Sequence, residues 1–142
     1  MDRRRFFTLS VATLFVLAVA CPWAASPVGA VSCVVSGTGN YAGCNLSGQD
    51  LSGMDLHGSN FSAANLNGTN LSGDNLVRAN ISKASAIGAD FSYTNLTRAN
   101  LSNTNLTNAT LLGATVANST NLFGATLCNT TMPSGAVNNS GC

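Results

Sequence analysis

Side chains capable of catalysis or metal binding are few in this chain of 142 residues, and they form no established catalytic or metal-binding motif. His57 is the only histidine, and glutamate is absent. The serines recur regularly along the chain, with no neighbouring base that would activate a hydroxyl as a nucleophile. No pair of acids has acid–base spacing, and no calcium-loop motif occurs. We therefore predict no catalytic residue, no cofactor and no metal site, and expect that the protein is not an enzyme.

The cysteines indicate one covalent chemistry, which is disulfide formation. Beyond residue 30 the chain has one close pair, Cys33 and Cys44, and a second close pair, Cys128 and Cys142. An even number of cysteines in an exported chain is typical of disulfides, so we predict one bond within each pair, out of three pairings that could form. Each bond closes a loop of about a dozen residues and contributes roughly 2–4 kcal/mol. The alternative, a zinc site, is disfavoured because no Cys-x-x-Cys motif occurs.

Residues 1–30 have the composition of an export signal. Arginines at 3–5 precede an apolar stretch over 6–20, and small residues lead to a predicted cleavage after Ala30. The apolar stretch is short for a membrane span, so retention as an anchor is the alternative. Both the general secretory and the twin-arginine routes fit the arginines, and lipid attachment at Cys21 is a further alternative. We expect an exported protein, secreted or located in the periplasm or cell envelope.

Few charges remain after residue 30. Three cationic side chains against four aspartates give a formal net charge of −1. A chain of this kind is not steered toward nucleic acid or an acidic membrane surface by its net charge. We predict no nucleic-acid partner, and membrane contact only through the signal segment.

A large apolar residue recurs at every fifth position between Tyr41 and Val116. One extra residue near Ser119 shifts the phase, and the series continues at Leu122 and Leu127. Helix faces repeat every 3.6 residues and strand faces every two, so neither element explains the period. The apolar residue is usually preceded by Asn or Asp and followed by Ser or Thr, with a small residue two positions before it.

This A-(N/D)-L-x-x pattern resembles the pentapeptide-repeat family over residues 39–129, most closely at 79–83 (ANISK) and 99–103 (ANLSN). The resemblance implies an all-β fold, a right-handed quadrilateral β-helix (pentapeptide-repeat solenoid) of about four to five coils. Each pentamer forms one side, and twenty residues complete a coil. Residues 31–44 and 130–142 are expected to be the N-terminal and C-terminal caps.

Stacking the chain in coils of twenty residues predicts two misfits in the core. Ala86 stands where other repeats have a large residue, which leaves a thin spot unless Ile87 turns inward. Asp74 stands at an inward position, where a carboxylate would need partners. We expect a local bulge that turns Asp74 outward.

Other side chains are expected on the surface. His57 is predicted to be solvated, since its column contains no carboxylate. Arg78 and Arg98 should stack, with Lys83 one side away; they are a candidate interaction patch for an anion, a sulfated glycan or a partner carboxylate, the alternative being a solvated corner. The repeat itself generates the Asn-x-Ser/Thr sequences, and the asparagine columns are predicted to form amide ladders.

We expect an exported, non-enzymatic structural or protein-interaction solenoid, monomeric, whose partner is an unknown protein or surface polymer. One alternative is a surface-binding module for glycan, cell wall or ice, because serines recur along two faces. The resemblance implies another, since the best-understood relatives mimic DNA and bind DNA gyrase. The low charge and the export signal disfavour that function.

Overall fold

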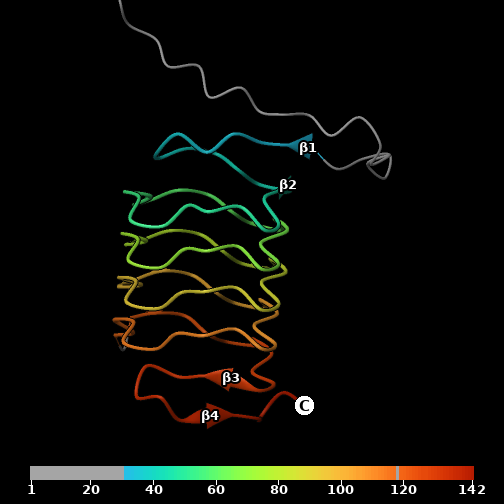
Figure 1. Cartoon of the computed structure of the whole chain (residues 1–142), viewed down its shortest axis with the longest axis vertical. Coiled ribbons are helices and arrows are strands. Elements are labelled where there is room, and N and C mark those ends of the chain that lie inside the picture. Colours follow the sequence, from blue (N-terminus) through green and yellow to red (C-terminus); the bar gives the residue numbers. More distant parts are fainter. Residues whose placement is uncertain (1–30, 118) are drawn as a thin grey trace, which may run out of the picture.

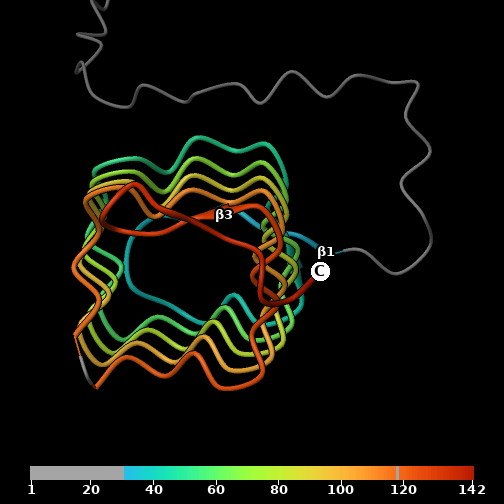
Figure 2. The ribbon, with the colours of Figure 1, turned by 90° about the horizontal axis from the view of Figure 1, so that it is seen from below.

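The computed structural model describes residues 31–117 and 119–142, so the predicted export signal lies outside the described residues. The chain forms a stack of coils along the long axis of the molecule (Figure 1). Seen along that axis, the coils superimpose in a four-sided outline (Figure 2). The described residues include no helix able to span a membrane.

The strands are short and lie at the two ends of the stack (Figure 1). β1 (Val31–Ser32) pairs in parallel with β2 (Cys44–Asn45), whereas β3 (Thr130–Thr131) pairs antiparallel with β4 (Val137–Asn138). Between the ends, isolated parallel bridges join successive coils.

The bridges fix the register of the coils. They join residues twenty apart, from Asn40–Asn60 to Asn95–Thr115. The next bridge, Asn100–Asn121, joins residues twenty-one apart. The extra residue therefore lies between Thr115 and Asn121, as the sequence predicts.

Each period of five consists of an extended segment and a corner. In the corner that follows Leu46, the N–H of Gln49 donates to the carbonyl of Leu46 at 3.1 Å. Gly48 has a φ of 68°, a left-handed conformation that glycine adopts readily. In the extended segment, the N–H of Leu46 donates to the carbonyl of Asn65 in the next coil at 2.8 Å. The backbone therefore turns through one corner every five residues and bonds to the coils on both sides.

The large residue of each repeat fills the interior of the stack. From Leu46 to Leu111 these side chains are almost fully buried, and the small residues two positions before them line the same interior. The ring of Tyr41 stacks on Phe61, with centroids 5.1 Å apart. Each buried large side chain contributes about 1.5–3 kcal/mol.

Ala86 is fully buried, and the alternative that Ile87 turns inward to fill the thin spot is wrong. Ile87 is 39 % exposed. Ala86 keeps both regular bonds, donating to the Asn105 carbonyl at 2.8 Å and accepting from the N–H of Ala89 at 3.2 Å. These bonds hold residue 87 at the corner, where a side chain points away from the core.

A disulfide lies at each end of the stack, in the pairs that the sequence predicts. Cys33 is bonded to Cys44, and Cys128 to Cys142. The second bond holds the segment that contains β4 against the last coil.

Candidate interaction surface

One of the four sides carries an uninterrupted ladder of asparagine side chains. We call it the ladder side: the extended segments that hold the ladder, with the corners before and after them. The Nδ2 of each later asparagine donates to the Oδ1 of the preceding one, with distances between 3.0 and 3.3 Å. The ladder comprises Asn40, Asn60, Asn80, Asn100 and Asn121.

The Oδ1 atoms of the ladder accept hydrogen bonds from their own coil as well as from the next asparagine. The Oδ1 of Asn80 accepts from the N–H of Ser82 at 3.2 Å as well as from Asn100. The Oδ1 of Asn100 accepts from the N–H of Ser102 at 3.1 Å as well as from Asn121. Each amide nitrogen has two hydrogens and gives one to the ladder. The ladder therefore offers solvent mainly donors.

The three predicted patch residues border the ladder side. Arg78 and Arg98 lie at its first corner, one coil apart, and Lys83 lies at its second corner. All three are exposed, and no residue in 31–117 or 119–142 forms an ion pair with them. Each has a φ of 60°, the left-handed conformation that glycine or asparagine adopts in most other corners.

The carboxylates lie outside the ladder segments, although Asp55 belongs to the extended segment that leads into the first corner of the ladder side. Asp50, Asp74 and Asp90 belong to the side ten residues further along the coil, which we call the acidic side and which lies opposite the ladder side (Figure 2). Its ladder is incomplete: Asn70 donates to Asp50 at 3.0 Å, but Asp90 has no amide hydrogen with which to continue the ladder. A side-chain hydrogen bond from Ser52 lowers the pKa of Asp50.

Asp74 points into the core, so the expected outward bulge is wrong. Its side chain is 1 % exposed, and its Oδ1 accepts from the N–H of Met54 at 2.7 Å. The backbone keeps its register, because Asn75 donates to Met54 at 3.0 Å and Asn95 donates to Asp74 at 2.9 Å. A bulge would break these bonds.

The Asp74 carboxyl is only partly satisfied. Its Oδ2 has no hydrogen-bond partner among the described residues. Burial raises the pKa of Asp74 to about 7, and the charge of Asp50 adds to the effect, while the hydrogen bond from Met54 opposes it. A buried carboxyl of this kind is neutral below that pH.

The Asp74 carboxylate also takes the place of a backbone hydrogen bond in the corner that follows Leu51. In the regular corners the backbone N–H that follows the turn donates to the carbonyl of the large residue, as Ser59 does to Leu56 at 3.1 Å. At the equivalent place Met54 donates to Asp74, and the carbonyl of Leu51 accepts from no described residue.

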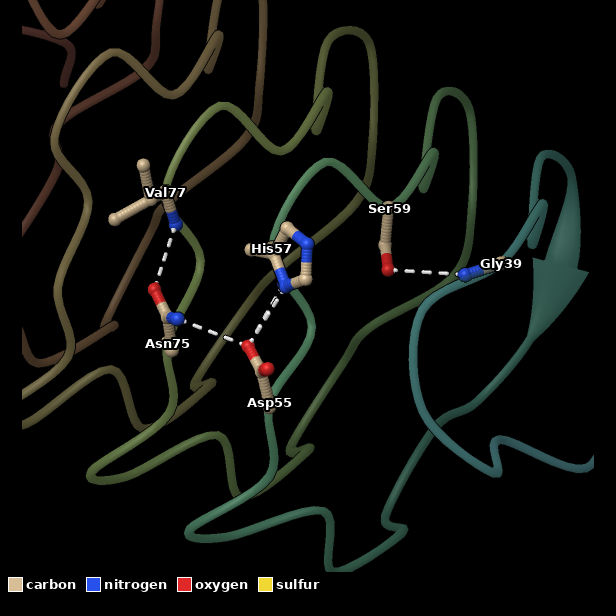
Figure 3. A network of polar contacts seen from close by, with 6 residues as sticks. All are labelled: Gly39, Asp55, His57, Ser59, Asn75 and Val77. Atoms are coloured by element: carbon tan, nitrogen blue, oxygen red, sulfur yellow. Dashed lines mark hydrogen bonds and ion pairs between the residues drawn. The ribbon is translucent and has the colours of Figure 1, made fainter.

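His57 contacts Asp55, which the sequence reasoning missed. The Nδ1 of His57 lies 3.0 Å from the Oδ1 of Asp55, and Asn75 donates to the same oxygen at 2.9 Å (Figure 3). The hydrogen bond from His57 lowers the pKa of Asp55. Both side chains are largely exposed, as expected for His57. The described residues contain no cluster of metal ligands.

Phe123 is a second feature that sequence reasoning missed. It occupies the corner column of the ladder side that holds Ser62, Ser82 and Ser102, and it is 81 % exposed. The sequence feature that could have revealed Phe123 is the replacement of serine by an aromatic residue at this corner position, directly after the phase shift.

The sequence matches the Pentapeptide repeats family in eight copies, over residues 42–73 and 75–113. A comparison with curated proteins finds no match.

Two solved structures are similar. One is a pentapeptide repeat protein from the thylakoid lumen of Arabidopsis thaliana, 33 % identical over 66 % of this chain and 61 % of that chain, with a TM-score of 0.52. The other is a pentapeptide repeat protein from Nostoc PCC 7120, 31 % identical over 55 % of this chain and 64 % of that chain, with a TM-score of 0.53. This chain thus spans about three fifths of the length of each. The family match, the five-residue period and the stacked coils show that the chain belongs to the pentapeptide repeat family.

Proposed function

We propose that the protein is an exported, non-enzymatic solenoid that presents a flat polar side to a partner. The observation that carries this proposal is the ladder side, where a regular array of donors runs along the whole stack. The partner is a protein or a surface polymer, and the solenoid acts as a monomer.

The proposed architecture is a right-handed quadrilateral β-helix of four to five coils with a cap at each end. Bridges from Asn40–Asn60 to Thr110–Thr131 support that coil number, since twenty residues make one coil. The disulfides at residues 33–44 and 128–142 support caps at 31–44 and 130–142, because open coil ends expose unpaired backbone groups and need protection.

Export is supported by the signal-like composition of residues 1–30 and by the two disulfides, which persist in oxidising compartments. A similar protein, 33 % identical, comes from the thylakoid lumen. The case for DNA mimicry is weaker still, because Asp74 is buried and only three aspartate side chains, Asp50, Asp55 and Asp90, remain on the surface of residues 31–117 and 119–142.

Photocrosslinking from each side in turn tests this proposal. The full chain is produced in its host with benzoylphenylalanine at one corner position at a time, and the mass of the product shows whether residues 1–30 are removed. Thr97 and Ser82 lie at the two corners of the ladder side, and Thr107 and Ser92 lie at the two corners of the acidic side. We expect a processed, envelope or secreted product that crosslinks one partner through one side. Retention in the cytosol, or no crosslink from any side, would contradict the proposal.

A further inference from the structure

We propose that the ladder side binds an acidic polysaccharide, which lies along the stack with its anionic groups between the cations of the two corners. This inference rests on the proposed function and deepens it, because it names the binding side and the chemical class of the partner.

The hydrogen-bonding groups of the ladder side favour a ligand rich in acceptors. The oxygens of Asn60, Asn80 and Asn100 each accept a backbone N–H and a ladder N–H. The second N–H of each amide has no acceptor among the described residues, and successive amides stand about 4.8 Å apart. Ring oxygens, hydroxyls and carboxylates of a polysaccharide are acceptors that recur along a line.

The charges of the ladder side favour an anion. Arg78 and Arg98 border the ladder on one corner and Lys83 borders it on the other, while no carboxylate occurs in the segments between. The acidic side faces the opposite direction (Figure 2). Of the four aspartates beyond residue 30, only Asp55 lies next to the ladder side. The three cations outnumber the carboxylates there and give that side a positive potential, which attracts and orients a polyanion.

The three cations occupy positions that are unfavourable for folding. A left-handed φ disfavours any residue with a side chain such as Arg or Lys by about 1–2 kcal/mol. Arg78 and Arg98 also stack in register, which places like charges side by side. Strain of this kind is concentrated at functional sites. Ala63 and Tyr93 share this conformation without a formal charge, so it is the combination of strain and charge at all three cations that supports a binding role.

Phe123 distinguishes a polysaccharide from an acidic peptide. Its exposed ring stands at the end of the corner column formed by Ser62, Ser82 and Ser102. An aromatic ring offers an apolar face on which the C–H face of a sugar can pack. Protein partners, in contrast, are held mainly by clusters of buried apolar anchors, and the described part of this side offers a single exposed ring.

Binding measurements with three polymers test the inference. The full chain, oxidised, is titrated calorimetrically with polygalacturonate, with neutral dextran and with poly-L-glutamate at low and physiological salt. We expect binding to polygalacturonate that weakens with salt, no binding to dextran, and weaker binding to poly-L-glutamate.

Two sets of variants locate the site. Replacing the cations together, as Arg78→Gly, Lys83→Gly and Arg98→Gly, keeps residues that suit the left-handed corners and should weaken polygalacturonate binding on the order of tenfold or more. Phe123→Ser, which restores the serine of its column, should weaken it several-fold. Leu112→Ser is the matched control, because Leu112 occupies the same corner position on the acidic side and is 41 % exposed.

Circular dichroism and the disulfide content confirm that each variant is folded. Equal binding of dextran or poly-L-glutamate, or unchanged binding in the triple variant, would overturn the inference. An effect of Leu112→Ser as large as that of Phe123→Ser would also overturn it. A protein crosslinked through one side, without polygalacturonate binding, would refute the polysaccharide while leaving the proposed function intact.

Discussion

The ladder side and the acidic side are built from the same five-residue unit but use their polar groups differently. On the ladder side the Oδ1 of an asparagine such as Asn80 accepts a backbone N–H from its own coil and an amide N–H from the asparagine of the next coil. The amide N–H groups that remain point outward. On the acidic side Asn70 donates to Asp50, but Asp90 has no amide hydrogen and ends the ladder there, and Asp74 occupies the core. The Asp74 side chain shows that this repeat tolerates an inward carboxylate at a position where backbone bonds to both neighbouring coils hold the register. Among the described residues, a continuous row of bonds between side-chain amides occurs only on the ladder side, where asparagine stands in every coil.

Asp74→Thr should produce the largest effect on stability. Threonine occurs at equivalent inward positions, where Thr69 donates to the carbonyl of Leu46 at 2.8 Å. The free carbonyl of Leu51 should accept from the new hydroxyl in the same way. At pH 8.5 we expect the free energy of unfolding to rise by about 2–4 kcal/mol, measured by denaturant unfolding of the oxidised protein.

The pH dependence of the parent protein follows from the same group. Because the pKa of Asp74 is raised from 3.8 to about 7 on folding, the folded state binds the proton more tightly than the unfolded state. The stability is therefore greatest below about pH 4 for this group and falls as the pH rises to about 7. Asp74→Thr should abolish this decline, whereas Asp90→Asn should retain it. A decline that persists in Asp74→Thr would show that another group is responsible.

Asn80→Ala should have an intermediate effect. It removes one amide from the middle of the ladder, with its bonds to Asn60, Ser82 and Asn100, and should destabilise the protein by about 1–2 kcal/mol. Asn70→Ala on the acidic side is the matched variant and should have a smaller effect, because no side chain donates to Asn70 from the following coil. Equal losses of stability in the two variants would mean that the bonds between asparagines contribute nothing beyond the bonds from the corner N–H groups.

Lys83→Asn should have the smallest effect, and it should stabilise the protein. Asparagine adopts the left-handed conformation more readily than lysine, and Asn103 occupies the same corner one coil later. We expect a gain of about 0.5–1 kcal/mol in thermal or denaturant unfolding. Ser82→Asn, at the neighbouring position without a positive φ, should give no gain. A loss of stability in Lys83→Asn would remove the strain argument for the cations.

Much of the fold follows from local spacing and was predictable. The period of five identifies the buried residues, the break near Ser119 appears as the change from twenty to twenty-one residues between bridges, and the cysteine pairs appear as disulfides at the ends. These features depend only on which residues recur at which interval. The positions of Arg78, Lys83 and Arg98 beside one face follow from the same interval.

What could not be predicted depends on competition between interactions. The inward orientation of Asp74 reflects backbone bonds to two neighbouring coils that outweigh the desolvation of its carboxyl, and a sequence gives no measure of that balance. The contact between His57 and Asp55 forms within one corner, so reasoning along columns missed it. The direction of the ladder bonds, which leaves donors outward, is set by the corner N–H groups that occupy each Oδ1, and the spacing of residues along the chain does not reveal it.

The most direct test of the ladder side as the binding surface is an NMR titration that follows the asparagine side-chain amide signals. Polygalacturonate is added to the 15N-labelled, oxidised protein, with the signals assigned. We predict that the Nδ2 signals of Asn60, Asn80 and Asn100 shift first and furthest, while those of Asn70 and Asn75 on other sides stay in place. Equal shifts on all sides, or shifts confined to Asn70 and Asn75, would contradict the ladder side as the binding surface.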